Sequence, residues 1–365
     1  MQASSGDDDS TSTQGPTAEI LTTDGNFVPT ALPIESVDWQ SAMKRAIRSS
    51  SELRQILGLP ESTEVAEIQG EADFPTFVPL EFLSRIRRGD PADPLLRQVL
   101  AIADEDISSP GFTADPVGDL PSLAAGGLIH KYENRALLIT TGACGVHCRY
   151  CFRREFPYSD AGSRAQNWQP AIEYLKQHEE IDEVLLSGGD PLTLVDGKLD
   201  ELISQLESIA HLKRLRFHSR MPIVIPQRIT PELVKRLAAS RLTVWFVVHA
   251  NHVNELDEAV LSRLAMLIDA GIPVLNQAVL LRGVNDRADA LSDLCLQLVN
   301  HRVQPYYLHQ LDRVRGASHF EVPVEEGLNL MRQLRTRLPG YAVPSFVCEE
   351  AGQPSKTPIA DNGTI

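Results

Sequence analysis

Three cysteines in one short run, Cys144, Cys148 and Cys151, are the residues of this chain with the most specific chemistry. Their spacing is C-x3-C-x2-C. Three thiolates that lie this close in the sequence can each bind one iron of a 4Fe–4S cluster, which leaves the fourth iron without a protein ligand. An open iron can bind a small molecule, and this property distinguishes a reactive cluster from a simple electron carrier.

A zinc site, a four-cysteine ferredoxin site and a disulfide are the alternative uses of such a run. Either metal site needs a fourth cysteine nearby, but the other two cysteines, Cys295 and Cys348, are far away in the sequence. Cys295 falls among leucines on a predicted helix, so we expect it in the core as a small apolar side chain. The open cluster is therefore the favoured interpretation.

The composition limits the class of protein. A chain of 365 residues allows two domains or one large α/β barrel with additions, and 42% hydrophobic residues can fill its core. The net charge of −15 disfavours binding to nucleic acid. The first residues lack the basic and apolar regions of a signal peptide, and no apolar run is long enough to span a membrane. Because clustered free cysteines are typical of a reducing compartment, we expect a cytoplasmic protein.

The chain divides into four predicted segments. Residues 1–33 are rich in Ser, Thr, Asp and Gly and predict a disordered acidic tail. Residues 34–128 predict an N-terminal helical region, and residues 129–322 predict the barrel that carries the cysteines. Residues 323–365 predict a helix followed by a loop rich in Gly and Pro.

Apolar, β-branched strands alternate with helical patterns from residue 135 onward. Strands are predicted at 135–141, 181–187, 212–218, 243–249, 273–281 and 304–311. Helices are predicted between them at 167–178, 198–210, 231–239, 255–270 and 287–301, with Thr230 and Asn285 at expected capping positions. Because parallel strands need a crossover helix, the six β/α units predict an α/β fold, a partial (β/α)6 barrel of the TIM type.

Polar residues gather where these strands end, which is where barrels of this kind place their chemistry. They are Ser187, Gly188, Gly189 and Asp190 after the second strand, Ser219 and Arg220 after the third, His249 after the fourth and Gln277 on the fifth. The two glycines would let a ligand approach the backbone closely, and the aspartate could hold an ammonium group. Each residue alone could be a cap or a buried polar group, but together they indicate one shared ligand.

The cysteine run and these strand ends resemble the radical SAM enzymes. The C-terminal residues 344–350 and 352–358 resemble the end of the lysine 2,3-aminomutase family, and the resemblance covers about residues 35–360. It implies that the three cysteines hold a 4Fe–4S cluster and that the polar strand ends bind S-adenosylmethionine. It also implies that Lys356 forms a Schiff base with pyridoxal 5′-phosphate (PLP).

The same resemblance implies three further contacts with PLP, from Lys131, Tyr132 and Arg135. Arg135 and Lys131 would bind its phosphate. The family usually has arginine at position 131, and lysine keeps the charge but loses the planar fork of the guanidinium.

Three charged residues are implied for an amino-acid substrate with a distal ammonium group, L-lysine. Arg153 would pair with its α-carboxylate. Asp312 and Glu349 would receive its distal ammonium, although the family more often has aspartate at position 349. Without the resemblance, these two carboxylates would be solvated surface groups.

Within the family, the chain is most similar to the branch that makes (R)-β-lysine for post-translational modification of elongation factor P. Residues 94–100, 125–132, 149–154 and 308–312 carry this similarity, and the chain ends soon after Lys356. We therefore expect an isomerase that moves the 2-amino group of lysine to carbon 3, ahead of a separate β-lysine ligase, with a reductant such as flavodoxin or ferredoxin. The alternatives are a catabolic aminomutase for lysine or another amino acid, and a noncatalytic iron–sulfur electron carrier.

Overall fold

The computed structural model describes residues 37–59, 69–158 and 167–360. The predicted acidic tail, residues 1–33, lies outside them. The described residues of the other three predicted segments, 34–128, 129–322 and 323–365, belong to one compact unit. No helix in the described part of the chain is long and apolar enough to cross a membrane.

A ten-stranded sheet forms the centre of the fold, and its strand order follows the sequence from β1 to β10. Its parallel strands are β3 (Arg135–Thr141), β4 (Glu183–Gly188), β5 (Arg214–Ser219), β6 (Thr243–His249), β7 (Val274–Val279), β8 (Gln304–His309) and β9 (Ser345–Cys348). Strands β3 to β8 match the six predicted strands, which confirms the α/β partial barrel. The short strand β9 is an additional parallel strand that the sequence pattern did not indicate.

Antiparallel strands extend both edges of this sheet. Strands β1 (Leu123–Ala125) and β2 (Leu128–Tyr132) form an antiparallel hairpin, and β2 pairs with β3. The region predicted to be helical up to residue 128 therefore ends in strands. Gly126 and Gly127 turn the chain between them with φ values of 51° and 80°, which glycine adopts readily. At the other edge, β10 (Thr357–Pro358) pairs with β9 and fixes the backbone directly after Lys356.

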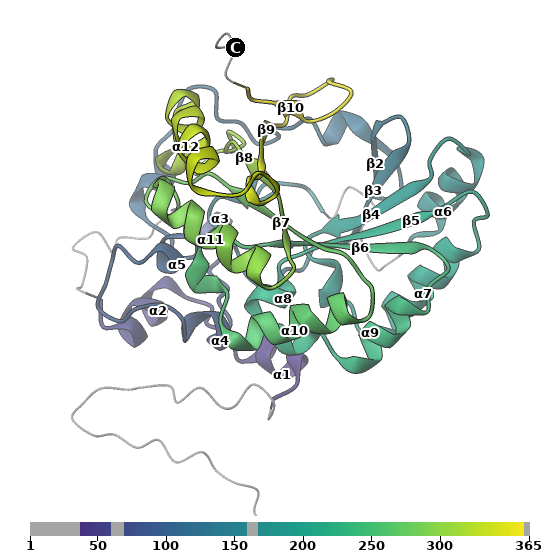
Figure 1. Ribbon diagram of the computed structural model, residues 1–365, viewed down its shortest axis with the longest axis horizontal. Helices are drawn as coiled ribbons and strands as arrows, with labels where there is room; N and C mark the ends of the chain where they lie inside the picture. Colours follow the sequence, from purple (N-terminus) through teal and green to yellow (C-terminus); the bar gives the residue numbers. More distant parts are fainter. Residues whose placement is uncertain (1–36, 60–68, 159–166, 361–365) are drawn as a thin grey trace, which may run out of the picture. The chain divides into compact units, whose positions relative to one another are not determined.

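Long helices lie along the outer side of the curved sheet (Figure 1). They are α6 (Gln169–Gln177), α7 (Asp196–Glu207), α9 (Pro231–Ala238), α10 (Glu258–Asp269), α11 (Ala288–Asn300) and α12 (Val324–Arg337). Each presents an apolar stripe to the sheet, as Leu199, Leu202 and Leu206 of α7 do. Thr230 caps α9 as predicted, whereas the prediction that Asn285 caps α11 is wrong, because its amide donates to the carbonyls of Asn251 and Val279.

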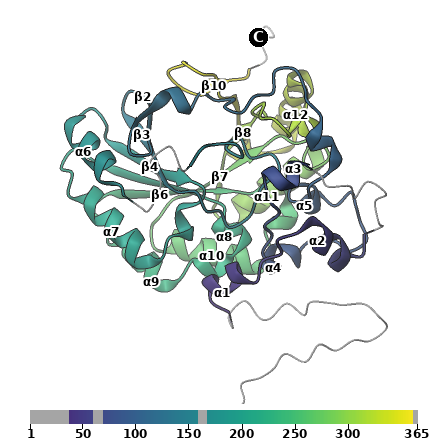
Figure 2. The ribbon, with the colours of Figure 1, turned by 180° about the vertical axis from the view of Figure 1, so that it is seen from behind.

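The N-terminal part consists of short helices joined by irregular chain. They are α1 (Trp39–Lys44), α2 (Ser50–Leu57), α3 (Gln69–Asp73), α4 (Leu80–Leu83) and α5 (Pro94–Arg97). Helix α4 packs against α8 (Met221–Val224), which follows β5, and Figure 2 shows both beside α10. This layer therefore covers the barrel on the side of α8.

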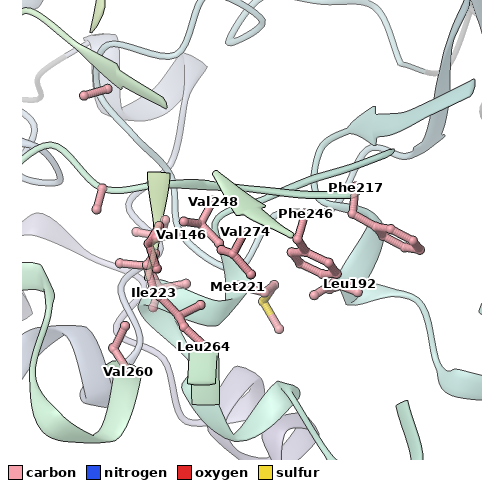
Figure 3. Close-up of a cluster of buried hydrophobic side chains, with 14 of the residues drawn as sticks. Val146, Leu192, Phe217, Met221, Ile223, Phe246, Val248, Val260, Leu264 and Val274 are labelled. Carbon is pink, nitrogen blue, oxygen red and sulfur yellow. The ribbon is translucent and has the colours of Figure 1, made fainter. Parts of the chain in front are cut away.

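A buried apolar cluster joins the strands to the loop that carries the cysteines (Figure 3). Phe217 of β5 and Phe246 of β6 stack with ring centroids 5.2 Å apart, and Ile223 of α8 lies in the same cluster. Val146, between the first two cysteines, is 3% exposed and belongs to this cluster. Burial of that side chain anchors the cysteine loop, residues 142–154, to the core.

Candidate active site

A cavity of about 280 Å³ lies at the carboxyl ends of the parallel strands. Every residue assigned from the sequence lines it: Cys144, Cys148, Cys151, Ser187, Gly188, Gly189, Asp190, Ser219, Arg220, His249, Gln277, Lys131, Tyr132, Arg135, Arg153, Asp312, Glu349 and Lys356. The structure thus brings together residues that are far apart in the sequence. Their individual roles in binding stay predictions.

The three cysteines of the loop are free thiols. Burial raises the pKa of Cys144 well above its ordinary value and that of Cys151 to about 11, and the neighbouring cysteines add to both shifts. Thiolates here therefore need positive charge beside them, which iron supplies. No three His, Cys, Asp or Glu side chains of the described residues converge as ligands of a single metal ion. A cluster does not need such convergence, because each cysteine binds its own iron.

The glycine pair at the end of β4, Gly188 and Gly189, lies against the cysteine loop and also lines the cavity. Gly188 has a φ of 118°, which other residues rarely adopt. A Cβ atom at Gly188 would crowd the carbonyl of Thr141, and one at Gly189 would collide with the carbonyl of Ala143. The glycines therefore let the end of β4 lie directly on the cysteine loop, and this close approach of two backbones is why side chains are absent there.

Asp190 is buried, and both of its carboxylate oxygens accept hydrogen bonds within the protein. Oδ1 accepts from the hydroxyl of Ser219 at 2.7 Å and from the amide of Leu192 at 3.0 Å. Oδ2 accepts from the amides of Arg220 at 2.7 Å and Met221 at 3.0 Å. This aspartate thus ties the end of β4 to the start of α8. Its predicted contact with an ammonium group would add to these bonds.

Two buried nitrogens at the cavity have no partner in the described structure. They are Nε of Arg220 and Nε2 of His218. Because an unpaired buried donor or acceptor is costly, such atoms fit a polar ligand. The carboxylate of S-adenosylmethionine is a suitable acceptor for Nε of Arg220. The neighbouring His249 is neutral, because burial together with the charge of Arg220 lowers its pKa to about 3.

Glu349 lies beside three residues assigned to PLP, one of which is Lys131, with Nζ 3.7 Å from Oε1. Its Oε2 is 2.6 Å from Nζ of Lys356, and its Oε1 accepts a hydrogen bond of 2.7 Å from the hydroxyl of Tyr132. Burial opposes ionisation of this carboxyl, but Lys356 and Tyr132 outweigh it, so the pKa of Glu349 lies below its ordinary value. The guanidinium of Arg135 stacks over the Tyr132 ring at 4.2 Å.

Asp312 has a different environment from Glu349. It is half-buried at the cavity, and no hydrogen bond from the described residues reaches its carboxylate. Burial raises the pKa of Asp312 to about 7, an effect that Lys356 opposes and Glu349 reinforces. A cation bound beside this carboxyl would favour its ionised form.

Asp119 is a site residue that the sequence did not reveal. Its Oδ2 lies 2.7 Å from Nε of Arg153 and its Oδ1 lies 2.6 Å from Nζ of Lys131. All three side chains line the cavity, and Arg153 is only 7% exposed. This aspartate fixes the two cations relative to each other, although no spacing pattern links it to either of them in the sequence.

A second group of polar residues that the sequence missed lies behind Arg220. Gln98 and Glu255 are buried and bonded to its guanidinium, and Tyr150 hydrogen-bonds to both Arg220 and His249. Gln98 directly follows α5, Glu255 lies in a short 3-10 helix after β6, and Tyr150 lies on the cysteine loop.

Sequence comparisons with known proteins identify relatives of this chain. Residues 138–295 match the model of the Radical SAM superfamily. The L-lysine 2,3-aminomutase of Escherichia coli (strain K12) is 47% identical over 323 residues, which are 88% of this chain and 94% of that protein. The L-lysine 2,3-aminomutase of Haemophilus influenzae is 42% identical over 327 residues, 90% of this chain and 97% of that protein.

Among solved structures, Streptococcus suis SuiB bound to S-adenosylmethionine is similar with a TM-score of 0.44 and 14% identity, over 62% of this chain and 52% of that one. The sequence relatives decide the family. Their identity and coverage are high along nearly the whole described chain. This chain therefore belongs to the lysine 2,3-aminomutase family of radical SAM isomerases.

Proposed function

We propose that this protein converts L-lysine into (R)-β-lysine with a 4Fe–4S cluster, S-adenosylmethionine and PLP, and that the product serves the β-lysylation of elongation factor P. One observation carries the proposal. The cavity that contains the three cysteines also contains a buried arginine, Arg153, and the carboxylates Asp312 and Glu349 beside Lys356. A substrate with one carboxylate and a distal ammonium matches these charges.

The residues around Lys356 fit PLP. When bound, the reduced cluster and S-adenosylmethionine supply the radical that takes a hydrogen atom from carbon 3 of lysine, and PLP supplies the conjugated system that carries the amino group. Lys356 provides the amine that bonds to the cofactor. Arg135 and Lys131 provide two cations for a phosphate, and Lys131 also donates to the carbonyl of Val117 at 2.7 Å.

The remaining lining residues position the substrate and exclude water. Arg153 can present its guanidinium to the α-carboxylate, because Asp119 holds its Nε. Asp312 and Glu349 receive the distal ammonium. Apolar side chains from β2, β3 and β4, namely Ile129, Leu137 and Leu185, complete the walls. Because side chains from several strands would hold the substrate in one position, hydrogen transfer at carbon 3 is favoured over side reactions of the radical.

Similarity at residues 94–100, 125–132, 149–154 and 308–312 supports the link to elongation factor P. In this assignment, a separate ligase consumes the β-lysine. A reductant such as flavodoxin or ferredoxin supplies the electron to the cluster.

An anaerobic turnover tests the proposal. The full chain is reconstituted with iron, sulfide and PLP, then mixed with dithionite, S-adenosylmethionine and L-lysine, and the products are separated on a chiral column. (R)-β-lysine that the ligase then attaches to elongation factor P is the expected result. Mainly (S)-β-lysine would point to a catabolic enzyme, and 5′-deoxyadenosine without β-lysine would contradict the substrate. The Lys356→Ala variant is the matched negative control.

A further inference from the structure

The guanidinium of Arg220 lies against the sulfur of a cluster cysteine. Its Nη1 is 2.7 Å from Sγ of Cys148 and 2.8 Å from the hydroxyl of Tyr150. Its Nη2 donates to Oε1 of Gln98 at 2.6 Å and to Oε2 of Glu255 at 2.8 Å. Arg220 is 8% exposed, so its orientation depends on these neighbours.

Glu255 is itself held firmly in place. Its side chain is fully buried, at 0% exposure, in the short 3-10 helix Val253–Glu255 after β6. Besides Arg220, its carboxylate accepts from the amide nitrogen of the Gln98 side chain at 3.0 Å and from the backbone amide of Asn251 at 2.8 Å. Removing a partner from such a buried pair leaves a charge uncompensated.

Neither Glu255 nor Gln98 lines the cavity, although Arg220 and Cys148 do. Glu255 therefore makes no direct contact with the cavity in the described structure, and Arg220 is the side chain that connects it to the sulfur of Cys148. Hydrogen bonds to cysteine sulfurs and nearby charge are two of the factors that set the reduction potential of an iron–sulfur cluster. Because reduction adds negative charge, a guanidinium on a ligand sulfur favours the reduced cluster, and it does so strongly where water is excluded.

We propose that Glu255 is a positioning residue that holds Arg220 on the sulfur of Cys148 and thereby raises the reduction potential of the cluster. The inference rests on the proposed cluster at Cys144, Cys148 and Cys151. It assigns Arg220 a task in addition to the predicted contact with S-adenosylmethionine.

The test is a redox titration of the reconstituted full-length protein, in which the reduced cluster is followed by electron paramagnetic resonance. Glu255→Asp keeps the charge but withdraws it from Nη2 of Arg220, since the side chain is one methylene shorter. We expect the reduction equilibrium to shift at least tenfold toward the oxidised cluster, which is 59 mV for one electron. Glu255→Gln keeps the reach and an acceptor oxygen, so the potential should not fall.

Two other roles of Glu255, a purely electrostatic one and a purely structural one, predict different reduction potentials in these variants. If its charge alone acts on the cluster, Glu255→Asp leaves the potential unchanged and Glu255→Gln raises it, which would overturn the proposal. If Glu255 only supports folding, both variants bind less iron while the remaining cluster keeps the original potential, which also overturns it.

The redox titration includes a control for the Glu→Asp change itself and a second variant in case Glu255→Asp does not fold. Glu81→Asp makes the same change at a buried glutamate that pairs with Arg45, and neither residue lines the cavity, so its potential should equal that of the unmodified protein. If Glu255→Asp does not fold, Gln98→Met removes both the other acceptor on Nη2 and the amide that donates to Oε1 of Glu255, so the potential should fall. An unchanged potential in that variant would contradict the proposal. If the unmodified protein binds no cluster, the proposed function fails rather than this assignment.

Discussion

The carboxylate of Glu349 lies 2.6 Å from the ammonium nitrogen of Lys356, and its second oxygen accepts a hydrogen bond from the hydroxyl of Tyr132. Since Nζ of Lys131 also lies 3.7 Å from this second oxygen, the carboxylate is in contact with three residues assigned to PLP while it is itself assigned to the distal ammonium of lysine. Asp312 has no such partners among the described residues. We therefore expect the substrate ammonium to be the main bonded partner of Asp312, whereas Glu349 should respond to both substrate and cofactor.

Replacing Lys356 by alanine should abolish the visible absorption band that PLP gives when it is bonded to a lysine. The side chain is half-buried, and among the described residues it bonds to Glu349 alone, so the fold should persist and the circular dichroism spectrum should not change. Lys198→Ala is the matched control, because Lys198 lies on the outer helix α7. The control should keep the band, and a band that survives in Lys356→Ala would place the cofactor on another amine.

Binding of lysine should strengthen as the pH rises through about 7, the value to which burial raises the pKa of Asp312. Below that pH the carboxyl is neutral and attracts the distal ammonium of the substrate less strongly. Asp312→Asn should raise the KM for lysine about tenfold or more, the effect of losing one charged hydrogen bond. The variant should also lose the pH dependence of KM, and a KM profile that is unchanged by the substitution would exclude Asp312 as the titrating group.

The same carboxyl should make the folded protein less stable at higher pH. Its pKa in the folded state, about 7, lies above the ordinary value of 3.8, so its contribution to stability is fully present below that ordinary value and is lost as the pH rises through 7. Asp312→Asn should therefore raise the melting temperature at pH 8 and change it little at pH 4. Equal changes at both pH values would mean that the substitution acts through packing.

Replacing Cys148 by alanine should abolish both the cluster and turnover. The other cysteines outside the loop, Cys295 and Cys348, lie on α11 and β9 and do not line the cavity, so neither can substitute as a ligand. Iron content per chain and the absorption of the reconstituted cluster are the measurements. Cys295→Ala is the matched control and should retain the cluster. Turnover that persists in Cys148→Ala would rule out the assigned ligand.

The strands and long helices could be predicted because their signals are local. Apolar strands that are covered on both faces alternate with amphipathic helices, and the carboxyl ends of parallel strands meet at one edge. Strand β9 escaped prediction since its four residues give too short a pattern. The hairpin of β1 and β2 escaped for the same reason.

The positions of site residues could be predicted better than their contacts. Asp190 lines the cavity as expected. The sequence did not indicate that both of its carboxylate oxygens accept hydrogen bonds within the protein, from the hydroxyl of Ser219 and from backbone amides. Asp119 and Glu255 were missed because their partners, Arg153 and Arg220, lie 34 and 35 residues away in the sequence. No periodicity connects such pairs, since they meet only when separate β/α units close around the cavity.

Replacing Arg153 by alanine should weaken the binding of lysine more than that of S-adenosylmethionine. The guanidinium is buried, and Asp119 holds its Nε at 2.7 Å, so it is oriented before the substrate arrives. Loss of a charge-assisted pair with the α-carboxylate costs about 1.5–3 kcal/mol, which is roughly 10- to 150-fold in the KM for lysine. Asp119→Asn keeps a hydrogen-bond acceptor beside Arg153 and should therefore have a smaller effect. If both ligands lose affinity equally in Arg153→Ala, the residue supports the cysteine loop and does not bind the substrate.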